Sequence, residues 1–161
     1  MTRTFGKKAG ALTLLGDFLK TALALFACRM IFGTEGVFIG GIFCILGHAF
    51  PLFFKFKGGK GVVVAAAAML VLNPIVCIIC LLIFIVIVAF TGYVSLGSII
   101  AAFLFPLLNY KWYIYFAPLA LKTIFCILMG LFIIFLHRKN IVRLFNGTEN
   151  KFGKNKTEKL K

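Results

Sequence analysis

The sequence predicts an all-α, polytopic integral membrane protein, a bundle of about six membrane-spanning helices. Of its 161 residues, 62% are hydrophobic and 14% are charged, and the mean hydropathy is +1.07. Soluble domains contain about 45–50% apolar and about 25% charged residues, and a fold of this size has too little interior for so much apolar surface. Only helices and closed barrels satisfy every backbone polar group within a bilayer. The apolar stretches are continuous and lack the alternation of barrel strands, so helices are expected.

Six apolar stretches are expected to form these helices, since a span needs roughly 20 apolar residues, or fewer where protein shelters it. Gly33–Gly36 is a tight polar link, and Asn73-Pro74 stops a helix. Asn109–Trp112 is a polar and aromatic break typical of the headgroup level. In chain order the stretches are Leu12–Phe32, Val37–Phe54, Val62–Leu72, Ile75–Phe90, Leu96–Leu108 and Trp112–Leu136.

The distribution of charge predicts the orientation of the bundle. Lys and Arg total 18 against 4 Asp and Glu, which gives a net charge of +14. Cations concentrate at the amino terminus, at residues 55–60 and after residue 137, whereas the opposite connections hold only Arg29, Lys111 and Glu35. The positive-inside rule places the first set in the cytoplasm. We expect a helical bundle over residues 1–151 and a basic, disordered tail over 152–161.

Metal and redox chemistry have weak support. All five cysteines lie in apolar stretches, and the C-x-x-C spacing of Cys77 and Cys80 has neither a second pair nor a nearby histidine. We therefore interpret these cysteines as small apolar residues on a helix. The chain lacks an H-E-x-x-H motif, and we expect neither a metal site nor a cofactor. Nucleic-acid binding is the least favoured class, because the cations are divided among membrane loops.

A glycine-rich basic loop is the most specific candidate site. Lys57-Gly58-Gly59-Lys60-Gly61 opens directly into a predicted helix. Glycines let backbone N–H groups approach an anion, a helix N-terminus adds partial positive charge, and lysines complete the neutralisation. The loop is not a Walker A motif, because its spacing differs and Gly61 stands where Ser or Thr would bind magnesium. Taken alone, these residues fit a phosphate site and a flexible loop at lipid headgroups equally well.

An acidic and a basic residue share a face of the first predicted helix, Asp17 and Lys20 at i and i+3. Ionisable residues within a span are functional candidates. A mutual ion pair near the cytoplasmic end also explains them, and we favour that interpretation. Helix packing is the simple interpretation of the small, polar stretch from Ser95 to Ser98.

Taken together, the clusters resemble the bacterial membrane family of glycerol-3-phosphate acyltransferases that use acyl phosphate as the donor. The matching stretches follow the family's order over nearly the whole chain, and the family looks like a seven-span protein with an outside amino terminus. In this resemblance Arg3 matches the end of the first motif, so the first span and most of that motif are absent. The resemblance therefore implies a truncated or mis-started reading, weakly active or inactive alone. The stretches are Arg3–Lys20, Gly47–Val62, Ser95–Ser98 and His137–Glu149.

The resemblance also implies an activity, which is acyl transfer from acyl phosphate to the sn-1 hydroxyl of glycerol 3-phosphate, without a cofactor. The products are lysophosphatidic acid and phosphate, as the first step of phospholipid synthesis in the bacterial inner membrane. A soluble enzyme that forms acyl phosphate is an implied partner. The implied site residues are Arg3, Lys57, Gly58, Gly59, Lys60, Gly61 and Ser98 for substrate binding, His137 and Asn140 for catalysis, and His48, Arg143 and Glu149 for support, with Glu149 pairing Arg143.

A small transporter or channel subunit for an anionic solute is the alternative, with the basic loops as its entrance. It predicts ionisable residues along the middle of the spans, and beyond Asp17, Lys20 and Lys122 these are sparse. A structural membrane subunit without chemistry leaves three matching motifs on one membrane face unexplained.

Overall fold

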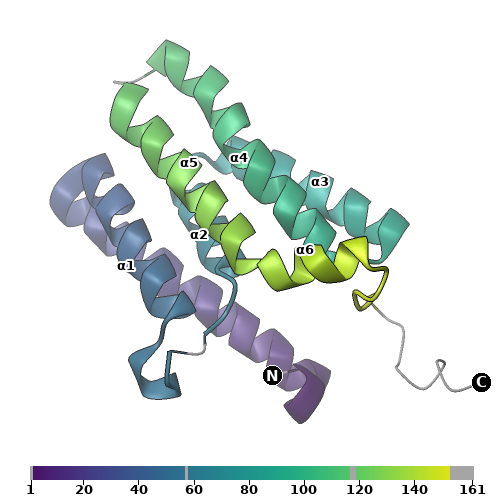
Figure 1. The fold of residues 1–161 in the computed structure, drawn as a ribbon. Coiled ribbons are helices and arrows are strands. Elements are labelled where there is room, and N and C mark those ends of the chain that lie inside the picture. The colour runs from purple at the N-terminus through teal and green to yellow at the C-terminus, as the bar shows by residue number, and fades with distance from the viewer. Residues whose placement is uncertain (1, 57, 117–118, 153–161) are drawn as a thin grey trace, which may run out of the picture. The chain divides into compact units, whose positions relative to one another are not determined.

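The computed structural model describes residues 2–56, 58–116 and 119–152, and their side chains except at 2–7, 54, 111–116 and 119–121. All regular secondary structure of the described chain is helical, which confirms the predicted fold class (Figure 1). It divides into two compact units, Met1–Cys77 and Ile78–Lys161. The elements are α1 (Thr2–Ala49), the 3-10 helix η1 (Leu52–Phe54), α2 (Val62–Leu72), α3 (Pro74–Thr91), α4 (Val94–Phe116), α5 (Leu119–Leu136) and α6 (Arg138–Phe145).

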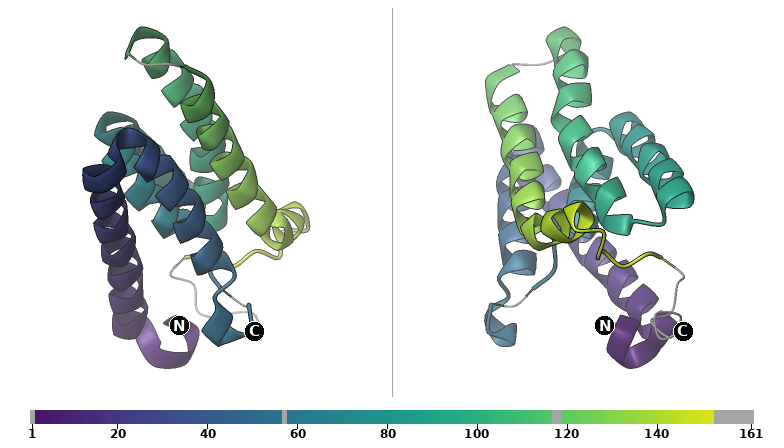
Figure 2. Two further views of the ribbon diagram at one scale, coloured as in Figure 1. Left: turned by 90° about the vertical axis from the view of Figure 1, so that its left-hand side faces the viewer. Right: turned by 45° about the vertical axis from the view of Figure 1, so that its right-hand side comes forward.

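Helix α1 folds into two antiparallel arms, as Figure 2 shows. The reversal occurs at Gly33, whose φ of 66° lies in the left-handed region that favours glycine. Glycines also line the contact between the two arms. A Cβ at Gly36 would overlap the carbonyl of Cys28, and a Cβ at Gly40 would lie 2.9 Å from the sulfur of Cys28 and 3.2 Å from Leu25. Small residues therefore let the arms pack closely, as in many membrane helix pairs.

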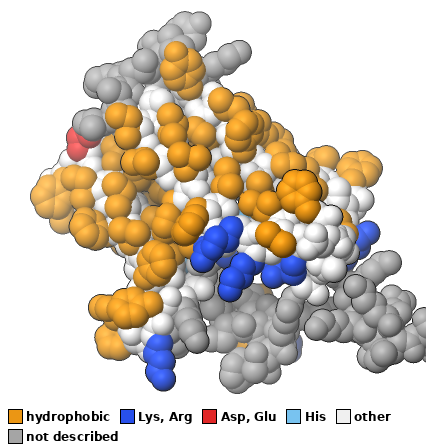
Figure 3. Space-filling model, viewed as in Figure 1, with side chains coloured by type: hydrophobic (Ala, Val, Ile, Leu, Met, Phe, Trp, Pro, Cys, Tyr) orange, Lys and Arg blue, Asp and Glu red, His pale blue; other side chains and the backbone are white. Residues whose placement is uncertain are grey.

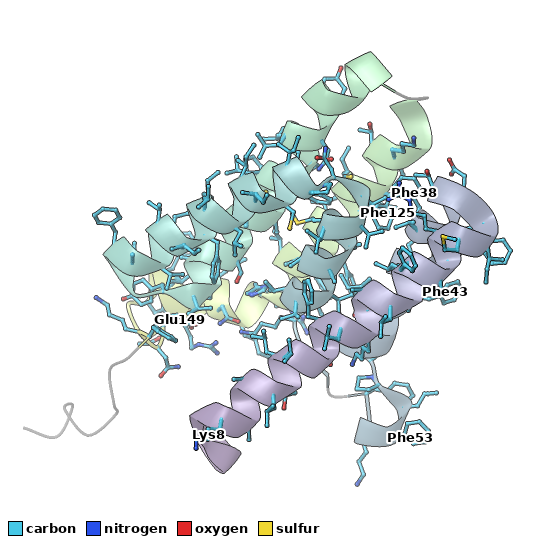
Figure 4. The ribbon with its side chains drawn as sticks, turned by 180° about the vertical axis from the view of Figure 1, so that it is seen from behind. Lys8, Phe38, Phe43, Phe53, Phe125 and Glu149 are labelled. Carbon is cyan, nitrogen blue, oxygen red and sulfur yellow. The ribbon has the colours of Figure 1, made fainter. Side chains whose placement is uncertain are left out.

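The second arm ends earlier than predicted. Helix α1 stops at Ala49 rather than at Phe54, because Pro51 has no N–H to donate and its ring crowds the preceding turn. The three residues that follow form η1, and Phe53 projects from it with 97% of its surface exposed (Figure 4). The helix is therefore shorter, and the loop that leads to α2 longer, than the sequence predicts.

The predicted stop at Asn73-Pro74 is confirmed, and its mechanism is a shared cap. The backbone N–H of Asn73 donates to the carbonyl of Met69 (2.7 Å), which closes α2. Its side-chain oxygen accepts a hydrogen bond from the N–H of Val76 (3.2 Å), which caps the first turn of α3. On the first arm of α1, the guanidinium of Arg29 donates to the carbonyl of Val71 at the end of α2 (2.9 Å).

The predicted break at Asn109–Trp112 is wrong, because α4 continues to Phe116. The side chain of Asn109 is 1% exposed and donates to the carbonyl of Phe105 one turn earlier (2.9 Å). A polar side chain that bonds within its own helix can stay buried. The polarity of the sequence therefore predicted a helix end at a position where α4 continues.

Helices α4 and α5 cross at a proline and a glycine. Pro106 lies inside α4 and lacks an N–H, so the carbonyl of Ala102 loses its usual donor four residues later. On α5, Gly130 packs against this carbonyl, and a Cβ there would lie 2.6 Å from the oxygen. The missing side chain therefore allows the two helices to approach closely.

Two helices of the described chain are long and apolar enough to span a membrane, α1 from Lys8 to Ala49 and α3. Lys122–Leu136 of α5 joined to α6, with a bend of 57°, makes a third candidate, while Val62–Leu72 and Val94–Tyr110 are shorter apolar helices. Hydrophobic side chains cover most of the described surface visible in Figure 3. Such a surface is suited to lipid rather than to water.

Candidate functional site

The glycine loop folds back onto the end of α1. The N–H of Gly58 donates to the carbonyl of Ala49 (3.2 Å), and the N–H of Gly59 donates to the carbonyl of His48 (3.1 Å). A Cβ at Gly58 would overlap the carbonyl of His48 and lie 2.6 Å from the ring of Pro51. These two N–H groups are therefore used inside the protein, and glycine is needed here because the loop backbone touches the helix backbone.

The loop then opens into α2 through Gly61, whose φ of 75° again favours glycine. The carbonyl of Gly61 accepts the first helical hydrogen bond, from the N–H of Ala65 (2.8 Å). The first N–H groups of a helix have no helical acceptor and attract anions. Lys60, just before this end, is exposed. Of the other predicted cations, Lys57 and the side chain of Arg3 lie outside the described residues.

The predicted ion pair between Asp17 and Lys20 is present on the first arm of α1. A third group, which the sequence interpretation did not connect with it, faces the same carboxylate. Nδ1 of His48, on the second arm, lies 3.7 Å from the Asp17 oxygen. The antiparallel pairing of the arms brings residues 17 and 48 together, and only tertiary structure could reveal this.

A second polar cluster, in the Ile78–Lys161 unit, centres on Glu149 (Figure 4). One carboxylate oxygen accepts hydrogen bonds from the hydroxyl of Ser95 (2.9 Å) and the amide of Asn140 (2.7 Å), and the other accepts from Nε of Arg143 (2.6 Å). The Glu149 side chain is only 7% exposed. Burial opposes its ionisation, but the hydrogen bonds and the positive charge of Arg143 outweigh burial and hold the pKa of Glu149 below its ordinary value.

The carboxylate therefore ties the segment after α6 to α4 and to α6. The ion pair expected between Glu149 and Arg143 is present. Its links to Ser95 and Asn140 were missed, because residues 54 and 9 positions apart share no local pattern. The small, polar Ser95 had only a helix-packing interpretation in the sequence.

His137 lies at the bend between α5 and α6 and is 2% exposed. Its Nδ1 lies 2.8 Å from the carbonyl of Ile133, which fixes the ring against its own helix. The carbonyl of His137 accepts a hydrogen bond from the N–H of Asn140 (2.8 Å) and so starts α6. The bend and the cluster together place His137 and Asn140 on one short turn. Ser98, 4% exposed, donates its hydroxyl to the carbonyl of Val94 (2.9 Å) within α4.

The chain after α6 is also held at its end. The N–H of Phe152, where a disordered tail was expected to begin, donates to the carbonyl of Gly92 (2.7 Å). The ammonium of Lys151 lies 5.2 Å from the ring centroid of Tyr93, a cation–π distance. The rest of the predicted tail, residues 153–161, lies outside the described part of the chain.

Comparison with known proteins decides the family. A profile of the family described as glycerol-3-phosphate acyltransferase matches residues 1–147. The chain belongs to this family. The glycerol-3-phosphate acyltransferase of Clostridioides difficile (strain 630) is 39% identical over 165 residues, which cover 96% of this chain and 76% of that protein. The predicted enzyme class, a membrane acyltransferase of phospholipid synthesis, is thereby confirmed.

Two crystal structures of PlsY (YgiH), an integral membrane glycerol 3-phosphate acyltransferase, are similar to the fold. The lysophosphatidic acid form has a TM-score of 0.81 and 34% identity, covering 94% of this chain and 76% of that one. The glycerol 3-phosphate form has a TM-score of 0.82 and 34% identity, covering 94% of this chain and 75% of that one. This chain thus spans about three quarters of the length of its relatives.

Proposed function

We propose that this acyltransferase takes its acyl group from acyl phosphate and passes it to the sn-1 hydroxyl of glycerol 3-phosphate. The hydroxyl oxygen attacks the acyl carbonyl, the bond from that carbon to the phosphate oxygen breaks, and the hydroxyl proton passes to a phosphate oxygen of the donor. The products are lysophosphatidic acid and inorganic phosphate. Phosphate is already a good leaving group, so positioning and electrostatics provide most of the catalysis and no side-chain nucleophile is required.

The observation that carries the proposal is the glycine loop opening into α2, in a chain similar to a protein crystallised in a glycerol 3-phosphate form. Lys60 and the first N–H groups of α2 would bind a phosphate, because positive charge and N–H groups without a helical acceptor meet at this helix end. Gly58 and Gly59 would serve the site by shaping the loop. Lys57 and Arg3 would add positive charge.

The Glu149 cluster supports the second part of the proposal. Asn140 donates one amide N–H to Glu149. The second N–H of the same amide is suited to donate to a carbonyl or phosphate oxygen and so to orient it. His137 would carry a proton between reacting groups, as histidine does near neutral pH. Ser98 would contact substrate, and Arg143 and Glu149 would hold Asn140 in place.

The proposed location is the bacterial inner membrane, with the glycine loop and α6 on the cytoplasmic face. Figure 3 shows Lys and Arg side chains gathered near α6, which contains Arg138, Lys139 and Arg143. Cations of this kind favour the cytoplasmic side. A soluble enzyme that forms acyl phosphate would then deliver the donor to that face.

An assay in membranes tests both donor and acceptor. Membranes that contain the chain receive labelled glycerol 3-phosphate with either acyl phosphate or an acyl thioester, and the C. difficile relative is the positive control. We expect lysophosphatidic acid with acyl phosphate only. Product formed from the thioester alone would refute the proposed donor. No product with either donor, while the relative is active, would refute the activity of this chain.

Lys60→Ala tests the phosphate site. A hydrogen bond to a charged group contributes about 1.5–3 kcal/mol, so we expect KM for glycerol 3-phosphate to rise roughly 10- to 100-fold with a smaller change in kcat. Lys55→Ala, in the same loop and also exposed, removes the same charge and should leave KM near that of the wild type. Equal effects of the two variants would mean that general charge, and not Lys60, binds the substrate.

A further inference from the structure

A partly buried carboxylate and imidazole adjoin the glycine loop, and the proposed reaction uses neither. Asp17 and His48 lie on opposite arms of α1, with 20% and 14% of their side chains exposed. Lys20, the other partner of Asp17, is 60% exposed. A surface ion pair contributes little to stability, so the Lys20 contact alone does not explain why the carboxylate is largely buried.

The other edge of the His48 ring faces the loop. A Cβ at Gly59 would overlap Nε2 of this ring and would lie 2.8 Å from Cε1 and 3.0 Å from Cδ2. Gly59 is outside the set of glycines with positive φ, so it is required by space and not by backbone conformation. His48 therefore contacts Gly59 twice, through its ring and through the carbonyl that accepts the Gly59 N–H (3.1 Å).

We propose that Asp17 and His48 form a seat on which the phosphate-binding loop is positioned. Asp17 orients the imidazole by attracting its Nδ1 side, and the ring then fixes where the backbone of Gly59 lies. His48 is a positioning residue, because Lys60 and Gly61, directly after the seat, carry the anion-binding groups. This inference rests on the proposed function and deepens it.

The geometry explains why a charge is used for orientation. The distance of 3.7 Å between Asp17 and Nδ1 is too long for a hydrogen bond, whereas electrostatic attraction still acts over it. A carboxylate on one side of an imidazole favours the proton on the nitrogen that faces it, which settles both the tautomer and the ring orientation. An error of about 1 Å in substrate placement can cost about 100-fold in rate. Fixing the position of the loop therefore preserves the rate of the proposed reaction.

A double-mutant cycle tests the ring contact. Gly59→Ala should raise KM for glycerol 3-phosphate about 10- to 100-fold, because its methyl group pushes the loop off the ring. Adding Gly59→Ala to His48→Ala should raise KM less than about threefold further, because the ring is gone. Gly47→Ala, whose Cβ would meet nothing within 4 Å, is the matched control and should behave as the wild type. If Gly59→Ala raises KM by the same factor with and without the His48 ring, the proposal is overturned.

Hydrogen exchange of the loop amides gives a readout that does not depend on activity. The N–H groups of Gly58 and Gly59 should exchange faster in His48→Ala and in Asp17→Asn than in the wild type, because their acceptors are less well fixed. Asp17→Asn should change nothing further once His48 is alanine. Exchange unaffected by either change would refute the seat even if the enzyme is active. If the variants exchange faster but the wild-type protein shows no acyltransferase activity, the role of Asp17 and His48 would stand and only the proposed function would be refuted.

Discussion

Replacing Glu149 with glutamine tests whether one carboxylate holds the segment after α6. Glutamine keeps the shape and one oxygen acceptor, but it removes the negative charge and directs an N–H group at a donor of Arg143. The two bonds from Ser95 and Asn140 change from charged to neutral, each losing about 1 kcal/mol. Arg143 is 40% exposed and water can solvate it, so its loss adds about 1 kcal/mol or less.

The expected total is a loss of about 2–3 kcal/mol in unfolding free energy, or roughly 5–10 °C in the unfolding midpoint on the scale of a soluble chain of this size. A thiol-reactive fluorescent dye can follow unfolding in detergent, because Cys80 and Cys126 are 3% and 0% exposed. Glu35→Gln makes the same chemical change at an exposed site and should shift the midpoint by less than about 1 °C. A Glu149→Gln midpoint equal to that of the wild type would refute the assigned role.

The pH dependence of stability gives an independent check on Glu149. Its pKa is lower in the folded protein than in the unfolded chain, so its stabilising contribution is fully present above the unfolded pKa, about 4.3. That contribution is lost as the pH falls through the lower folded pKa. The difference in midpoint between wild type and Glu149→Gln should therefore be constant near neutral pH and should shrink under acid conditions.

Two packing predictions use the same unfolding assay. Gly130→Val should destabilise the crossing of α4 and α5 by about 1–3 kcal/mol, because its side chain meets the Ala102 carbonyl. The control is Gly16→Val, whose Cβ meets nothing within 4 Å and which should cost far less stability. Equal losses of stability in the two variants would refute the packing argument. Asn73→Ala should cost about 1 kcal/mol of stability, because it removes the cap on the N–H of Val76. Asn73→Ser should recover most of this loss. A serine variant no more stable than the alanine variant would show that the cap is not the cause.

Local chemistry made much of the fold predictable. The Gly33 reversal and the Asn73-Pro74 stop depend on a few adjacent residues, and the sequence located both. The Asp17–Lys20 pair was predictable for the same reason, since i and i+3 share a helix face. Polarity misled the prediction at Asn109, whose side chain donates a hydrogen bond within α4 and does not end the helix.

The contacts between distant segments were not predictable from pattern. The link from Ser95 to Glu149 joins a helix to a loop 54 residues away, and the approach of His48 to Asp17 needs the two arms of α1 to pair in one register. The glycine loop is a further case. Its composition indicated an anion site, but the sequence could not reveal that the N–H groups of Gly58 and Gly59 donate to the end of α1.

The scarcity of acidic residues is consistent with the binding of phosphate groups. An unpaired carboxylate about 6 Å from a bound phosphate would repel each of its unit charges by about 3 kcal/mol at an effective dielectric constant of about 20, enough to weaken binding about 100-fold. The chain has only 4 acids against 18 Lys and Arg residues. Asp17 and Glu149 each lie within an ion pair, with Lys20 and Arg143. Each carboxylate can therefore hold a loop in place while its own unit of the protein keeps the positive charge that the two anionic substrates of the proposed reaction would require.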